Sequence, residues 1–185
     1  MRFSSNYSEM SFFQKVRNLD YILLTCILAL GIISSLAMYS TEGGEFLFYS
    51  KSHVYKFTIF FFMMIFLSFL NIKYWYFFGY IFYGFVLFFL IWAAFYGVKA
   101  SGSQRWINLY FINLQPSELM KIAVITCLAK YYHRLQPEKV NSFQTVTTVV
   151  VILIIPIMLV LSQPDLGTSI LIGLSGIVVV WLAGL

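Results

Sequence analysis

The sequence has few charged residues for its length. Charged side chains make up 10% of its 185 residues, against about 25% in an average soluble domain. A soluble chain of this size could not cover its surface with so few polar groups, which excludes a cytosolic enzyme and a disordered scaffold. Basic residues outnumber acidic ones by 12 to 7, but they are scattered and form no basic stripe. We therefore expect no nucleic-acid partner.

The sequence also has little that could bind a metal. Its two cysteines, Cys26 and Cys127, both lie in apolar runs, and no CxxC pair is present. His53 and His133 have no acidic or cysteine neighbours at ligand spacing. We therefore expect no disulfide, no structural metal and no cofactor.

Apolar residues dominate what remains. Hydrophobic residues make up 61% of the chain, aromatic residues 20%, and the mean hydropathy is +0.84. A membrane-spanning helix needs about 20 mostly apolar residues. The pattern predicts an all-α fold, a polytopic bundle of about six spanning helices over residues 21–185, preceded by a polar segment over residues 1–20. The expected spans are about 21–38, 55–72, 75–96, 119–132, 145–162 and 168–185.

The basic residues indicate the orientation of this bundle. Placing the N-terminus in the cytoplasm puts 7 of the 12 basic residues in inner segments: Arg2, Lys15, Arg17, Lys73, Lys130, Arg134 and Lys139. Because inner loops carry an excess of Lys and Arg, we predict a cytoplasmic N-terminus. The first apolar run is too long for a cleaved signal, and no typical cleavage site follows it.

Two polar segments then lie on the outer side, at about residues 97–117 and 162–168. Glu118 and Lys121 are three residues apart at the start of the fourth span, so a helix places them on one face. A charge at mid-membrane costs about 2.5–3.5 kcal/mol, and pairing beside a polar cavity reduces that cost. The alternative is an interfacial pair that only caps the helix, with Ser117 as N-cap.

Three further residues could take part in an outer site. Arg105 suits bidentate phosphate recognition and Trp106 suits the headgroup level, so the pair could bind a lipid pyrophosphate or only anchor the chain at the interface. Asp165 is expected to cap the sixth span whatever else it does. It could also serve the site, because a carboxylate in an apolar chain must be solvated, paired or protonated. Composition alone does not separate a transporter from an enzyme.

The polar segments resemble a known signature. Gly102-Ser103-Gln104-Arg105-Trp106-Ile107, Gln115-Pro116-Ser117-Glu118-Leu119-Met120-Lys121 and Gln163-Pro164-Asp165-Leu166-Gly167-Thr168 follow one another at the expected distances. Together they resemble the SEDS family, the shape, elongation, division and sporulation proteins of bacteria. Their forms are nearer to its rod-shape branch than to its division branch.

The resemblance implies a specific activity. The family polymerises lipid II into glycan strands on the outer face of the bacterial cytoplasmic membrane, with a class B penicillin-binding protein as partner. Its fold has ten spanning helices, and its catalytic aspartate lies in an outer loop between the seventh and eighth. That loop is expected beyond Leu185, so the chain resembles an N-terminal half, and no catalytic residue is assigned here.

The resemblance also implies substrate-binding roles. Arg105 and Trp106 match the motif expected to face the pyrophosphate. Glu118 and Lys121 match a charged pair that lines the family's central cavity, and Asp165 matches a carboxylate that could be structural. Two other readings stay open, a lipid II flippase and a non-catalytic remnant. A transporter should contain an internal repeat, and we find none.

Overall fold

The computed structural model describes residues 11–100, 103–108 and 113–184. Arg2, Gly102 and Leu185, which the sequence analysis used, lie outside these ranges. The chain divides into two compact units, Met1–Asn71 and Ile72–Leu185. Each unit is described by itself.

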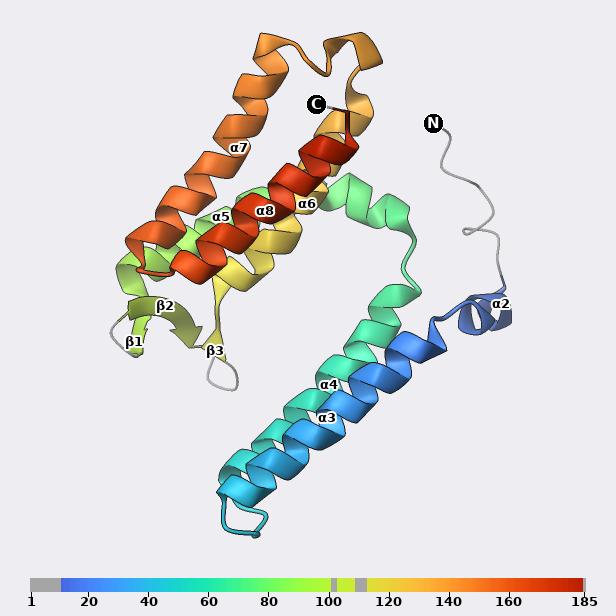
Figure 1. The fold of residues 1–185 in the computed structure, drawn as a ribbon, viewed down its shortest axis with the longest axis vertical. Helices are drawn as coiled ribbons and strands as arrows, with labels where there is room; N and C mark the ends of the chain where they lie inside the picture. The colour runs from blue at the N-terminus through green and yellow to red at the C-terminus, as the bar shows by residue number, and fades with distance from the viewer. Residues whose placement is uncertain (1–10, 101–102, 109–112, 185) are drawn as a thin grey trace. The chain divides into compact units, whose positions relative to one another are not determined.

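The first unit is a helical hairpin (Figure 1). It contains α2 (Phe12–Arg17), α3 (Tyr21–Thr41) and α4 (Phe48–Ser68), and α3 packs along α4. Asp20 caps α3, because its carboxylate accepts a hydrogen bond of 3.0 Å from the Leu23 N–H. Within the hairpin, Ser35 Oγ lies 3.3 Å from His53 Nδ1.

The turn of the hairpin explains why α4 begins seven residues before the expected start of the second span. The Glu42 carboxylate accepts hydrogen bonds from the N–H groups of Leu47, Tyr49 and Ser50 at 2.8–3.2 Å, and from the Ser50 hydroxyl. These donors lie at the start of α4, where helical N–H groups have no partner within the helix. The expected start at residue 55 was therefore wrong, since a carboxylate from the turn caps a polar first turn.

The second unit contains four long helices and a small sheet (Figure 1). The helices are α5 (Ile72–Tyr96), α6 (Pro116–Arg134), α7 (Phe143–Ser162) and α8 (Leu166–Leu182), with the short 3₁₀ helix η1 (Pro137–Lys139) before α7. Between α5 and α6 lie β1 (Val98–Ala100), β2 (Ser103–Asn108) and β3 (Asn113–Leu114), antiparallel in the order β1-β2-β3. We call the end of the unit that contains these three strands the sheet end.

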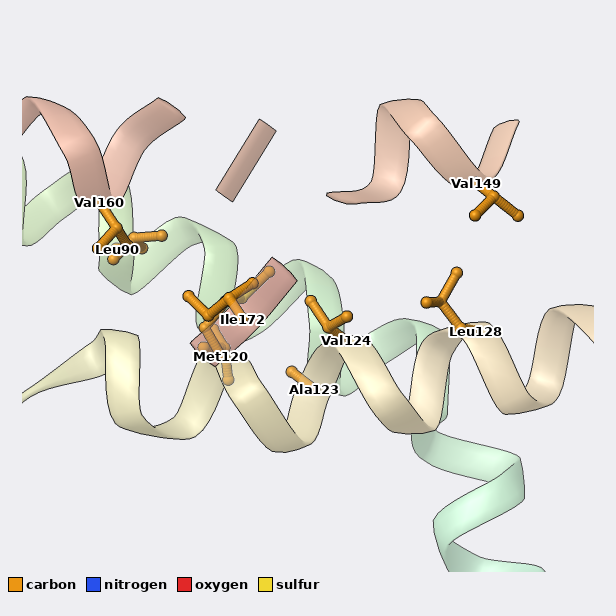
Figure 2. Packing of buried hydrophobic residues seen from close by; sticks show 9 residues of the cluster. Leu90, Met120, Ala123, Val124, Leu128, Val149, Val160 and Ile172 are labelled. Carbon is orange, nitrogen blue, oxygen red and sulfur yellow. The ribbon is translucent and has the colours of Figure 1, made fainter. Parts of the chain in front are cut away.

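Aliphatic side chains from all four helices form the core of this unit (Figure 2). The cluster consists of Val86, Leu90, Met120, Ala123, Val124, Leu128, Val149, Val160 and Ile172. Of the four helices, α6 contributes the most members, and it packs on α5, α7 and α8. The central position of α6 fixes where the polar residues of its first turn lie.

A proline inside α7 is supported by a neighbouring helix. Pro156 has no N–H, so the carbonyl of Ile152, four residues earlier, loses its helical donor. The Tyr83 hydroxyl on α5 donates a hydrogen bond of 2.8 Å to that carbonyl. This hydrogen bond replaces the one that the Ile152 carbonyl lost within α7, and it links α7 to α5 at the level of the core.

The expected all-α polytopic fold is confirmed, since each expected span is a helix. In the described residues, α3, α5 and α7 are long and apolar enough to cross a membrane unaided, and α8 is apolar but shorter. The bounds differ by a few residues at most ends, and the fourth span is longer than the 14 residues expected because α6 includes polar end turns. The three-stranded sheet was not predicted.

Candidate functional site

The sheet places Arg105 and Trp106 beside the end of α5. Val98 of β1 pairs with Trp106 of antiparallel β2, so β2 runs back toward the end of α5. Gly97 makes this close approach possible: a Cβ there would collide with the Ala93 carbonyl oxygen and lie 3.2 Å from the Trp106 carbonyl oxygen. Its N–H donates a 2.9 Å hydrogen bond to the Ala93 carbonyl. The close approach of two backbone segments therefore requires a residue without a side chain.

The central interaction of the sheet end is an ion pair. Arg105 Nη1 lies 3.1 Å from Asp165 Oδ2, and the two side chains are 26% and 10% exposed. Gln115 Nε2, just before α6, donates hydrogen bonds to Asp165 Oδ2 at 3.1 Å and to Ser117 Oγ at 3.0 Å. Asp165 thus joins the sheet, the start of α6 and the turn between α7 and α8.

Asp165 also caps α8, as the sequence predicted. Its Oδ1 accepts a 3.2 Å hydrogen bond from the Thr168 N–H. Burial raises the pKa of the Asp165 carboxyl, but hydrogen bonds from Thr168 and Arg105 and the charge of Arg105 outweigh it, so the net pKa lies below the ordinary aspartate value. Asp165 is therefore ionised at neutral pH, and it serves as cap and ion-pair partner at once.

Glu118 and Lys121 form the second ion pair, on the first turns of α6. Lys121 Nζ lies 2.8 Å from Glu118 Oε2, with side chains 25% and 55% exposed respectively. The predicted pairing on one helix face is confirmed. The alternative that Ser117 caps α6 is wrong: Gln115 is the N-cap residue, because Pro116 occupies the first helical position, where its missing N–H costs nothing.

Two glutamines that the sequence pattern did not single out join the elements of the sheet end. Gln115 links Asp165 to Ser117, and the buried Gln163 donates a 3.2 Å hydrogen bond from Nε2 to the Leu90 carbonyl on α5. Both glutamines were part of the quoted motifs, but as neutral residues they gave no charge signal. Four of the predicted residues therefore form two ion pairs, and Trp106 follows Arg105 in β2. No group of three metal-ligating side chains occurs in the part of the chain described.

Comparison with known proteins identifies the family. The family model for cell cycle proteins of the FtsW, RodA and SpoVE type matches residues 16–185. The chain belongs to this family. The resemblance drawn from the three motifs is thereby confirmed, and the protein is a multi-pass protein of the bacterial inner membrane.

Curated relatives align over about half of the chain. The peptidoglycan glycosyltransferase MrdB of Escherichia coli is 42% identical over 91 residues, 49% of this chain and 24% of that protein. A probable peptidoglycan glycosyltransferase FtsW of Coxiella burnetii is 36% identical over 107 residues, 57% of this chain and 29% of that protein. The matched segment thus spans about a quarter of each relative.

Solved structures share the fold over most of the chain. The crystal structure of the rod shape determining protein RodA of Thermus thermophilus matches with a TM-score of 0.74 at 21% identity, covering 88% of this chain and 53% of that one. A chain of a peptidoglycan synthase complex matches with a TM-score of 0.75 at 23% identity, covering 89% and 46%. The chain therefore spans about half of these structures, and the likeness establishes the helical membrane fold.

Proposed function

We propose that the chain forms part of a peptidoglycan glycosyltransferase that polymerises lipid II into glycan strands for cell elongation. The observation that carries this proposal is the clustering of the three family motifs at the sheet end, in a chain matched over residues 16–185 by the family model. The curated relatives named above are glycosyltransferases or probable ones, which favours this activity over lipid II transport and over a non-catalytic remnant.

In this proposal the described residues bind the substrate. A sugar hydroxyl attacks the anomeric carbon of a second lipid-linked sugar, the bond from that carbon to the pyrophosphate oxygen breaks, and the hydroxyl proton passes to a base outside this chain. Negative charge develops on the leaving pyrophosphate. Arg105 and Lys121 stabilise that charge, and cations fixed in place by Asp165 and Glu118 need little reorganisation as it forms.

The remaining predicted residues support those two cations. Trp106 places an aromatic ring at headgroup level beside Arg105. Asp165 holds the guanidinium from the side of α8, and Glu118 holds the Lys121 ammonium from the turn before it. The family resemblance implies that the catalytic aspartate lies in an outer loop that the described residues do not include.

The activity test uses the full-length protein with its class B penicillin-binding protein, fluorescent lipid II and a gel that separates glycan strands. We expect ladders from the parent and a loss of about 10²–10³-fold in rate for Lys121→Met, because removing one preorganised group that stabilises developing charge costs about 2.7–4 kcal/mol. Lys51→Met, an exposed lysine of α4, is the matched control and should polymerise like the parent.

Two results would contradict this assignment. If the parent protein produced no ladders, the proposed glycosyltransferase activity would be wrong. Equal rates for Lys121→Met and Lys51→Met would leave the activity in place but remove Lys121 from the site.

We further propose that a class B penicillin-binding protein is the partner that crosslinks the strands. The support is that one structural relative is described as a peptidoglycan synthase complex that coordinates polymerisation and crosslinking. The family resemblance points to the same class of partner.

We also propose that the N-terminus is cytoplasmic, which puts the sheet end on the outer side. Single cysteines placed at Ser103 and Asn141, in a background without Cys26 and Cys127, test this with an impermeant thiol reagent on spheroplasts. We expect labelling at 103 and protection at 141, because the loop after α6 carries the basic residues. The reverse pattern would invert the topology.

A further inference from the structure

The end of the second unit opposite the sheet holds a group of cations without carboxylate partners. It is formed by the first turns of α5, the last turns of α6 and η1, and we call it the basic end. Lys130, Arg134 and Lys139 lie there. Of the acidic residues described in this unit, only Glu138 belongs to this end, and Glu118 and Asp165 are paired at the other.

Lys130 is a buried ammonium held by aromatic rings. The residue is 6% exposed, and its Nζ donates a 2.7 Å hydrogen bond to the Phe77 carbonyl. The same nitrogen lies 4.5 Å from the ring centre of Tyr80 and 5.4 Å from that of Tyr76. No carboxylate of the described residues lies within ion-pair distance of it. The ring faces attract the ammonium electrostatically, but no carboxylate of the described residues pairs with it.

Arg134 lies one turn further along α6 and faces the same rings. Its Nε donates a 3.2 Å hydrogen bond to the Tyr76 hydroxyl, and its guanidinium carbon lies 5.8 Å from the centre of the Tyr80 ring. The residue is exposed, and no described carboxylate pairs with it. The hydrogen bond to Tyr76 restricts where the guanidinium can lie, and its planar fork of N–H donors suits bidentate contact with a phosphate.

The aromatic residues around these cations mark the depth of this end in the membrane. Tyr74 and Trp75 on the first turn of α5 are 59% and 36% exposed. Tyrosine and tryptophan concentrate where hydrocarbon meets headgroups. An exposed arginine beside them is therefore level with lipid phosphates.

We infer that the basic end binds the phosphate headgroup of an anionic phospholipid, with Arg134 as the direct contact and Lys130 supplying a positive field from beneath. Cardiolipin and related anionic lipids occupy basic pockets of this kind between membrane helices. The inference does not depend on the proposed enzyme activity, because it concerns the end away from the sheet.

The test is native mass spectrometry of the full-length protein in micelles containing equal amounts of cardiolipin and phosphatidylcholine. We expect the parent to retain cardiolipin selectively and Arg134→Gln to bind it about fivefold more weakly, because a basic residue near anionic headgroups is worth about 1 kcal/mol. Arg134→Lys should recover most of the affinity. Arg17→Gln, an exposed arginine of α2, is the matched control for loss of one charge and should behave like the parent.

Other outcomes would overturn the inference. Equal retention of cardiolipin by the parent and Arg134→Gln, or equal loss in Arg134→Gln and Arg17→Gln, would mean that no local site exists. Inorganic phosphate alone, added to protein in phosphatidylcholine micelles, tests a free anion as the ligand. If inorganic phosphate raised the melting temperature of the protein as much as cardiolipin does, the ligand of this site would be a soluble anion and not a lipid headgroup.

Discussion

Replacing Asp165 by Asn in the full-length protein is expected to lower the free energy of unfolding by about 2–3 kcal/mol, because it leaves Arg105 half-buried without its counter-ion. Asparagine caps helices about as well as aspartate, so the substitution removes the ion pair and keeps the cap of α8. The measurement is thermal or denaturant unfolding in detergent, followed by intrinsic fluorescence.

A double-mutant cycle makes this prediction specific. Arg105→Gln combined with Asp165→Asn should cost less than the sum of the single changes by about 1–2 kcal/mol, since the second change removes a partner that is already lost. Asp20→Asn is the matched control: Asp20 caps α3 in the same manner but has no ion pair in the described residues, so its effect should stay within about 0.5 kcal/mol. Additive single effects, or an equal loss from Asp20→Asn, would show that the ion pair does not hold the sheet end together.

Replacing Gly97 by Ala is expected to destabilise the protein by about 3 kcal/mol, at the upper end of the range for overpacking. The new Cβ would collide with the Ala93 carbonyl oxygen and crowd the Trp106 carbonyl. Both are backbone atoms, so relief requires unwinding the end of α5 or separating β1 from β2. We expect a lower yield of monodisperse protein in size-exclusion chromatography and a lower melting temperature.

Gly84→Ala is the matched control for Gly97→Ala. Gly84 lies inside α5, and a Cβ there would meet nothing within 4 Å. Because alanine is a better helix former than glycine by up to about 1 kcal/mol, Gly84→Ala should stabilise the protein. Shifts of the same sign in the two variants would mean that the contacts at Gly97 do not govern the stability of this turn.

Helices α3, α5 and α7 could be predicted because each is a long apolar run, and the lipid requires each run to satisfy its own backbone hydrogen bonds. The start of α4 could not be predicted, because it depends on the Glu42 carboxylate of the hairpin turn, which accepts hydrogen bonds from N–H groups of the first turn of α4. No local hydrophobic pattern encodes this contact. The sheet was missed because residues 97–115 are polar and irregular in period, and its position depends on a backbone approach at Gly97.

The ion pairs differ in how far the sequence could predict them. Glu118 and Lys121 are three residues apart on one helix, so helical geometry alone brings them together. Arg105 and Asp165 are separated by 60 positions, and only the packing of α8 beside α6 makes them neighbours. Both residues could be named from the sequence but not paired, and the capping role expected for Asp165 is accompanied in the structure by the ion pair to Arg105.

The buried lysine of α6 has a consequence for how the protein is made. Of the described helices, α6 is not among those apolar enough to span a membrane by themselves. Its Lys130 ammonium is accommodated by rings and a carbonyl that all belong to α5. We therefore expect α6 to enter the bilayer together with α5, because the groups that accommodate the Lys130 ammonium all come from α5.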